Sequence, residues 1–357
     1  MSKVTYLLGA GASYGRRGKL PLALQPPISS DMQAPQEGIL RGLPILQEFA
    51  SAIEQLLVEL MDDQFIAEIK YLSSNALNSL LHISYNYPTI DTYAKLLYAT
   101  KQEDEYIKFK NQLSLFFLIW QRLHKQDLRY DSFISSLVDA DTCQLPELTL
   151  LSWNYDVQME MAYEGYIDSP NLGDIWDTLN VYCKTNTHFP FNIKKPFAFI
   201  KLNGSAIFHS STRNEWTLRY DLKDVFQIRD GEQEFWKSMY ELNTNGNWNS
   251  NPIKYINELS YAWEHDGEEE LLSTISARVI DTEALVIIGY SFPYVNRKVD
   301  RHIFSSMTQL KKIYIQDKNP HCIEDRIKAI YQILDRPIPK IQTSTDLSQF
   351  IIPNELG

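Results

Sequence analysis

The chain has 357 residues, of which 44% are hydrophobic and 22% charged, and its formal net charge is −11. This composition is typical of a globular protein with enough apolar material for a sizeable core. Dense clusters of Lys and Arg, which binding to a phosphate backbone requires, do not occur, so we expect no direct nucleic-acid binding. No run approaches the ~20 apolar residues that span a bilayer, so we expect a cytoplasmic protein without membrane contact.

Metal and disulfide chemistry is not indicated by the cysteines or histidines. The three cysteines, Cys143, Cys183 and Cys322, are far apart and form no CxxC pair. The histidines show no metal-ligand spacing. We therefore expect free thiols in a reducing compartment and no bound metal.

The first half of the chain begins with a short β-prone run at residues 3–8, which ends in the turn Gly9–Ser13. A loop rich in Gly, Pro and Ser follows, through about residue 40. Apolar residues then recur at helical spacing, which predicts a helical insertion over about 43–140. Within it, the aromatic stripe at 109–123 is typical of a core or a subunit interface.

The second half alternates apolar strands with helical stretches. Strands are expected at 147–153, 197–202, 284–289 and 312–316, with a short one near 340, and helices at 156–166 and about 323–335. The segment of about 206–280 has weak periodicity and is predicted to be an irregular insertion. Strands that are apolar throughout and separated by helices predict an α/β fold: a Rossmann-like parallel sheet with helices on both faces and large helical insertions, in one domain over 1–357.

Four polar or glycine-containing clusters follow predicted strands: Gly9–Ser13, Asn154–Asp156, Asn203–Ser205 and Gly289–Ser291. Each alone is well explained by structure, as a turn or, for Asn-x-Asp, as a helix cap. Ligands of open parallel sheets collect outside the carboxyl ends of the strands, so we expect the four clusters to converge. Glycines would let a backbone approach a pyrophosphate closely.

The order of these motifs resembles a known family. The chain is similar to the sirtuin-like NAD hydrolases of bacterial antiphage defence in the order Gly-Ala-Gly-x-Ser, Asn-x-Asp, a strand ending in x-Gly-Ser, Gly-x-Ser, and a strand followed by Asp/Asn-x-Pro. Local matches to the zinc-free branch are Leu20-Pro21, Thr89–Tyr93 and Trp153–Glu160. The resemblance spans residue 5 to about 320 and is specific in the motifs rather than in the insertions.

The resemblance implies that NAD is the substrate and that no metal takes part. It implies that Asn154 positions the attacking water and that Asp156 supports the nicotinamide pocket. The other positions that it assigns to NAD are Gly9, Ala10, Gly11, Ala12 and Ser13 for the pyrophosphate, Gly204 and Ser205 after the third strand, Gly289 and Ser291 for phosphate or ribose, and Asp317 or Asn319 for the adenosine ribose.

The third cluster departs from the family, which usually has His-Gly where this chain has Asn203-Gly204. Asparagine can hydrogen-bond a ribose hydroxyl but cannot accept a proton near neutral pH. Three interpretations stay open. Asn203 orients the ribose while water or Asp156 handles the proton, or His209 reaches in, or the protein binds NAD without cleaving it efficiently.

The sequence thus leads to an NAD+ hydrolase that forms nicotinamide and ADP-ribose and depletes cellular NAD on infection. The alternative is a catalytically weak NAD- or ADP-ribose-binding subunit of a defence complex. An oxidoreductase is a more distant hypothesis, because Asp31, the acidic residue near the required spacing, lies in a Pro/Ser-rich loop rather than at a strand end. The expected partners are a second copy of the chain and a separate sensor protein, for example a nucleotide-sensing one as in the Kongming type of defence system.

Overall fold

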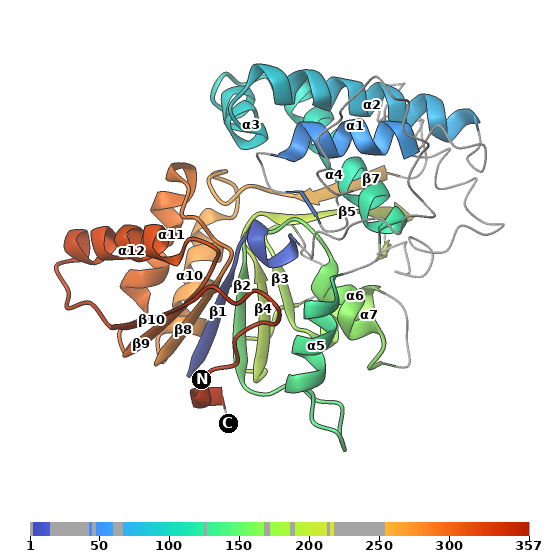
Figure 1. Ribbon diagram of the computed structural model, residues 1–357. Coiled ribbons are helices and arrows are strands. Elements are labelled where there is room, and N and C mark those ends of the chain that lie inside the picture. The colour runs from blue at the N-terminus through green and yellow to red at the C-terminus, as the bar shows by residue number, and fades with distance from the viewer. Residues whose placement is uncertain are drawn as a thin grey trace, which may run out of the picture.

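The computed structural model describes residues 3–14, 43–44, 48–59, 67–124, 127–167, 172–185, 190–212, 215–217 and 254–356. Its centre is a seven-stranded sheet in the order β10-β9-β8-β1-β2-β4-β3, with every neighbouring pair parallel (Figure 1). The strands are β1 (Val4–Leu8), β2 (Leu148–Ser152), β3 (Val181–Cys183), β4 (Phe197–Lys201), β8 (Ala284–Ile288), β9 (Lys312–Gln316) and β10 (Lys340–Ser344). The predicted Rossmann-like α/β fold is confirmed.

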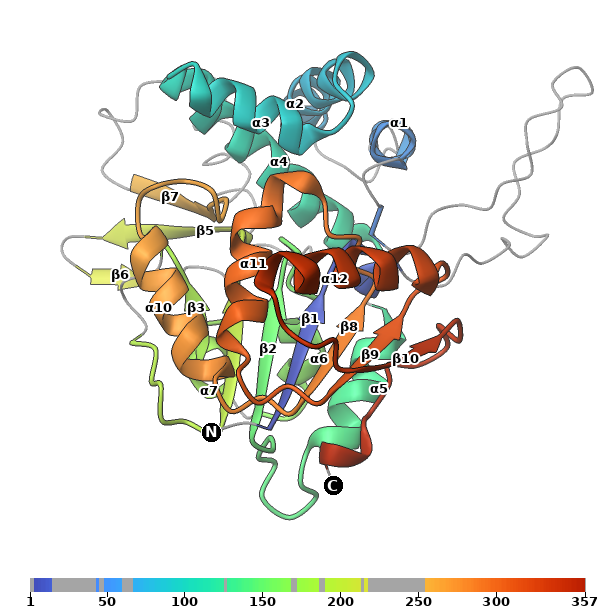
Figure 2. The ribbon, with the colours of Figure 1, turned by 90° about the vertical axis from the view of Figure 1, so that its left-hand side faces the viewer.

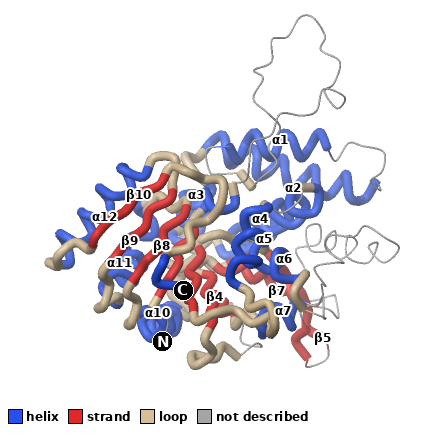
Figure 3. The backbone as a smooth tube through the Cα atoms, turned by 60° about the horizontal axis from the view of Figure 1, so that its bottom comes forward, coloured by secondary structure: helices blue, strands red, loops and turns tan. Residues whose placement is uncertain are grey.

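Helices cover both faces of this sheet. On one face lie α10 (Glu268–Val279), α11 (Arg297–Ser306) and α12 (Pro320–Leu334), and on the other α5 (Leu128–Leu137), α6 (Gln158–Glu164) and α7 (Leu172–Thr178), as Figures 2 and 3 show. The central strands β1, β2, β4 and β8 are buried along their whole length, which explains their continuous apolar runs. In β1, Tyr6 and Leu8 belong to one core cluster and Leu7 to the other, because successive side chains point to opposite faces.

The part of the predicted helical insertion before α5 forms a separate layer. It consists of α1 (Phe49–Glu59), α2 (Ala67–Asn86), α3 (Ile90–Ala99) and α4 (Glu103–Leu123), and it lies over the carboxyl ends of the strands in Figure 1. Within the aromatic stripe, Phe116, Phe117 and Trp120 are buried in the chain's own core. Phe116 packs on Phe49 of α1, with ring centroids 4.6 Å apart. The stripe is therefore core, and these side chains offer no surface to a partner.

The segment 206–280 differs from the predicted irregular insertion. It contains most of a three-stranded antiparallel sheet in the order β6-β5-β7, made of β5 (Gly204–Thr212), β6 (Glu215–Thr217) and β7 (Lys254–Leu259), and it also contains α10. Residues 218–253 lie outside the described residues, as does the predicted loop at 15–42. In the described part of the chain, no helix is both long enough and apolar enough to cross a bilayer.

The strand order changes direction at β1. From β1 the chain proceeds to β2 on one side, whereas β8, β9 and β10 extend the sheet on the other. Such a reversal leaves a crevice at the carboxyl ends of the two strands involved, here β1 and β8, and open α/β sheets bind ligands there.

Candidate functional site

A pocket opens at this edge of the sheet. It holds about 750 Å³ of space between atoms, part of it open to solvent. The described residues that line it are Ala10, Ser13, Leu43, Pro44, Phe49, Ile90, Asp91, Phe117, Trp153, Asn154, Tyr155, Asp156, Asn203, Gly289, Tyr290, Ser291, Pro293 and Asn296. They include members of all four predicted clusters, which follow the adjacent strands β8, β1, β2 and β4. The four turns therefore meet at one cavity.

The glycine turn after β1 packs directly on the turn after β8. The Gly9 amide donates to the Ile288 carbonyl at 3.0 Å, and the Gly11 amide donates to the Gly289 carbonyl at 2.9 Å. Gly289 has a φ of +58°, and a Cβ built there would lie 2.4 Å from the Gly11 carbonyl carbon. Glycine is required at both positions by this contact between two backbones.

The same contacts limit what the glycine turn can offer a pyrophosphate. The amides of Gly9 and Gly11 donate within the protein, and the Ala12 amide donates to the Gly9 carbonyl at 2.8 Å. Ala10 is exposed and lines the pocket. A phosphate at this turn would lie against Ala10 rather than in a ring of free amides.

Ser13 is the centre of a buried hydrogen-bond network. Its hydroxyl donates to Asp156 Oδ2 at 2.7 Å, accepts from Asn154 Nδ2 at 3.0 Å and lies 2.8 Å from the Tyr130 hydroxyl. A serine hydroxyl has one hydrogen and two lone pairs, so Tyr130 must donate when Asp156 takes that hydrogen. Ser13, only 2% exposed, therefore joins the first and second predicted clusters.

Helix α5 supports both clusters from within the protein. Arg129 of α5 donates from a terminal nitrogen to the Ala12 carbonyl at 2.9 Å and is paired with the buried Asp127. The Asp127 amide donates to Gln158 Oε1 at 2.8 Å, and the Gln158 amide donates to Asp156 Oδ1 at 3.1 Å. This polar layer fixes the turns after β1 and β2 relative to each other.

A buried ion pair between Lys201 and Glu160 holds the backbone of Asp156. Lys201 Nζ, at the end of β4, donates to the Asp156 carbonyl at 2.7 Å and to Glu160 Oε1 at 2.7 Å, and the Lys201 and Glu160 side chains are both 0% exposed. Burial raises the pKa of the Asp156 carboxyl above its ordinary value, and the charge of Lys201 opposes that rise. A carboxyl that lies beside a cavity and has a raised pKa is a candidate for proton transfer.

The two predicted asparagines both line the pocket but are held differently. The side-chain Nδ2 of Asn154 donates to the Ser13 hydroxyl, and the backbone N–H of Asn154 donates to Ser152 Oγ at 3.1 Å. Asn203 accepts the Ala262 amide on Oδ1 at 3.1 Å, and its Nδ2 lies 3.4 Å from the Trp153 carbonyl. The Asn203 side chain therefore joins two backbone segments and also borders the cavity.

Neither Gly204 nor Ser205 is among the described residues that line the pocket. Gly204 has a φ of +71°, and a Cβ there would lie 2.1 Å from the Glu258 carbonyl oxygen of β7. The pairing of β5 with β7 shifts its register between Gly204 and Phe208. Both residues have structural roles, because Gly204 lets β5 start against β7 and Ser205 is fully buried.

The two candidates for the adenosine ribose lie apart from this pocket. Asp317 and Asn319 follow β9, which is separated from β1 by β8, and neither is among the described lining residues. Asp317 Oδ1 accepts the Asn319 amide at 2.8 Å and so shapes the start of α12. Ser291, in contrast, is exposed and lines the pocket as expected. The side chain of His209 lies outside the described part of the chain.

One acidic residue of the pocket had no assigned role in the sequence. Asp91, near the start of α3, lines the cavity and accepts a hydrogen bond from the Tyr155 hydroxyl at 2.7 Å. Burial raises the pKa of its carboxyl, and the bond from Tyr155 opposes that rise. The motif Thr89–Tyr93 was visible in the sequence, but only the packing of α3 over the sheet brings it to the site.

An aromatic wall also escaped prediction. Trp153 and Tyr290 stack with ring centroids 5.6 Å apart and an interplanar angle of 14°. Tyr290 donates its hydroxyl to the buried carboxylate of Asp300, 3.0 Å from either oxygen. The signal in the sequence was an aromatic residue beside each of two polar clusters, at the ends of β2 and β8.

No family model matches the chain, and no curated protein matches it significantly.

Proposed function

We propose that this protein is an NAD+ glycohydrolase, which cleaves NAD+ with water to nicotinamide and ADP-ribose. The observation that supports this most is the meeting of Ser13, Asn154, Asp156 and Gly289 around one pocket at the β1/β8 crevice. These are positions that the resemblance to sirtuin-like NAD hydrolases assigns to NAD. The pocket's mixture of aromatic walls and few polar groups is that of small-molecule sites.

The reaction needs few groups. A water oxygen bonds to C1′ of the ribose while the bond from C1′ to the pyridinium nitrogen breaks and leaves its electron pair on nicotinamide. The water loses one proton, so the products are nicotinamide, ADP-ribose and H+. Because the leaving group departs neutral, the protein has to orient the water and stabilise the positive charge that develops on the ribose.

The residues fit these tasks as follows. The side-chain amide of Asn154, which is bonded to Ser13 and borders the cavity, would orient the water. The Asp156 carboxylate would accept the proton in place of the histidine that the family uses, because its raised pKa brings it closer to neutral pH. The pyrophosphate would pass Ala10 and Ser291, which line the pocket at exposed positions.

The alternative function, a catalytically weak subunit that binds NAD or ADP-ribose, is favoured by one observation. Asn203 bonds the Ala262 amide, so its side-chain oxygen already has a structural partner. If Asp156 does not replace the missing base, cleavage would be slowed by about 10²–10⁴-fold.

The biological setting is part of the proposal and follows from the resemblance. We propose a cytoplasmic effector that depletes NAD in antiphage defence and is held inactive until a separate sensor protein, or self-association, releases it. The buried aromatic stripe of α4 is not the surface for that contact.

The test measures nicotinamide released from NAD+ by the full-length protein, alone and with candidate partner proteins. We expect release by the wild type and a loss of at least about a hundredfold in Asn154→Ala. Asn86→Ala, the same change at an exposed site on α2, is the control and should retain wild-type release. Saturable binding of a fluorescent NAD analogue without nicotinamide release supports the alternative, and absence of both binding and release contradicts both functions.

A further inference from the structure

Asp91 is the acidic side chain that the helical layer contributes to the pocket. It occupies the first turn of α3, where Thr89 already caps the helix by accepting the Thr92 amide on its hydroxyl at 3.1 Å. An acid in a first turn is stabilised by the helix dipole whether or not it binds anything. The first turn of α4 shows that ordinary case, with Glu103, Asp104 and Glu105 all exposed.

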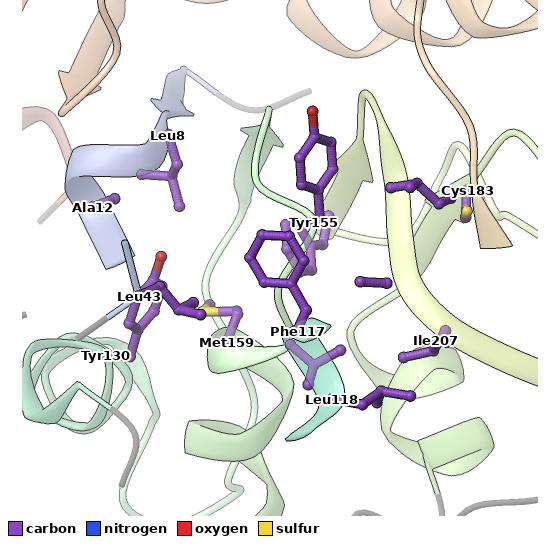
Figure 4. Packing of buried hydrophobic residues seen from close by; sticks show 14 of the residues in the cluster. Leu8, Ala12, Leu43, Phe117, Leu118, Tyr130, Tyr155, Met159, Cys183 and Ile207 are labelled. Atoms are coloured by element: carbon purple, nitrogen blue, oxygen red, sulfur yellow. The ribbon is translucent and has the colours of Figure 1, made fainter. Parts of the chain in front are cut away.

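Asp91 differs from those residues because a second element holds its carboxylate. The Tyr155 hydroxyl donates to Asp91 Oδ1 at 2.7 Å. Tyr155 is itself fixed by aromatic neighbours, with ring centroids 5.6 Å from Phe117 and 5.9 Å from Tyr261 (Figure 4 shows Tyr155 beside Phe117). The carboxylate is thereby held at the cavity wall rather than left free in solvent.

The charged side chains among the described residues that line the pocket are acidic. The described lining residues include two carboxyls, Asp91 and Asp156, and none of them is a Lys, Arg or His. Lys201, whose charge acts on the Asp156 carboxyl, is paired with Glu160 and bonds the Asp156 backbone from within the core. A ligand part that enters this region is favoured if it carries positive charge.

The aromatic wall indicates the shape of that ligand part. Trp153 and Tyr290 both line the pocket and are nearly parallel to each other. Aromatic side chains together with carboxylates favour a flat, cationic ring over an anionic or strongly hydrated group.

We propose that Asp91 recognises the positively charged pyridinium end of NAD+, and that the pocket therefore selects a cationic ring over a neutral ring of the same shape. This inference rests on the proposed function. It adds that the helical layer supplies substrate specificity to a site whose other polar groups come from the sheet. It also implies that oxidised NAD is preferred over its reduced, uncharged-ring form.

The test is a comparison of two hydrolysis-resistant ligands by calorimetry with the full-length protein. One is carbocyclic NAD, which retains the pyridinium charge, and the other is benzamide adenine dinucleotide, in which carbon replaces the ring nitrogen. We expect the wild type to bind the cationic ligand about tenfold more tightly, which is the scale of one partly screened charge interaction. Asp91→Asn should reduce that ratio to about twofold or less.

Two further variants complete the design. Asp104→Asn, the same change at an exposed first-turn position of α4, should keep the wild-type ratio. Tyr155→Phe keeps the Asp91 charge but removes its hydrogen bond, so an intermediate ratio is expected, and it serves if Asp91→Asn does not fold.

The outcomes separate the two claims. Binding of both ligands by the wild type, with a ratio that Asp91→Asn and Tyr155→Phe leave unchanged, overturns the role of Asp91 and leaves NAD binding intact. If neither ligand binds the wild type, the proposed function itself is contradicted, and this inference falls with it.

Discussion

Removing the Ser13 hydroxyl tests whether this group stabilises the fold through its internal hydrogen bonds or binds a phosphate of the ligand. Ser13→Ala deletes one bond to the Asp156 carboxylate and two to neutral groups, on Asn154 and Tyr130, all of them buried. A hydrogen bond to a charged group contributes about 1.5–3 kcal/mol, a neutral one about 0.5–1.5 kcal/mol, and lost bonds in one network are not additive. We therefore expect the free energy of unfolding to fall by about 2–4 kcal/mol.

The assay is urea unfolding of the ligand-free protein followed by tryptophan fluorescence, with the slope of the transition unchanged. Ser136→Ala is the matched control, because Ser136 is exposed on α5 and its hydroxyl bonds only the preceding helical turn, at the Ser132 carbonyl. If Ser13→Ala lowers the free energy of unfolding by less than about 0.5 kcal/mol and also weakens NAD binding, the stabilising role of the network is refuted and a phosphate contact is favoured.

Three further predictions concern the same site. Gly289→Ala should destabilise the ligand-free protein by about 1–3 kcal/mol or prevent folding, because the φ of Gly289 is +58° and the new Cβ would overlap the glycine turn. Gly165→Ala is the control and should not lower the melting temperature, because no atom lies within 4 Å of a Cβ built there. Asn203→Ala should cost about 1–3 kcal/mol in chemical denaturation, because the Ala262 amide loses its acceptor, and an unchanged midpoint would contradict that account. If Asp156 is the base, kcat/KM should fall as the pH falls through its raised pKa, which lies above 3.8, and a profile that stays flat down to pH 4 would argue against this role.

The sheet was predictable because its central strands are fully buried and therefore continuously apolar. The runs at β1, β2, β4, β8 and β9 were recognised within one or two residues of their observed ends. The edge strand β3, of only three residues, and the short helix α7 were missed, because segments of that length carry no clear periodicity. The antiparallel strands β5–β7 were missed for a related reason, since their stability comes from contacts with α4 and with each other.

The candidate site shows a different limit. Glycine is favoured both where a ligand approaches the backbone and where another backbone does, and the sequence does not distinguish the two. Gly204 was assigned to NAD, yet its environment is the β7 backbone. Asp91 shows the reverse case, because its motif was recognised but its place at the pocket depends on how α3 packs over the sheet.

The most direct test of the central claim is a crystal structure of the full-length protein with carbocyclic NAD. Our account predicts the nicotinamide ring and its sugar at the carboxyl ends of β8, β1, β2 and β4, with the Asn154 side chain within hydrogen-bonding distance of the sugar. A dinucleotide bound elsewhere, with this cavity empty, would contradict it.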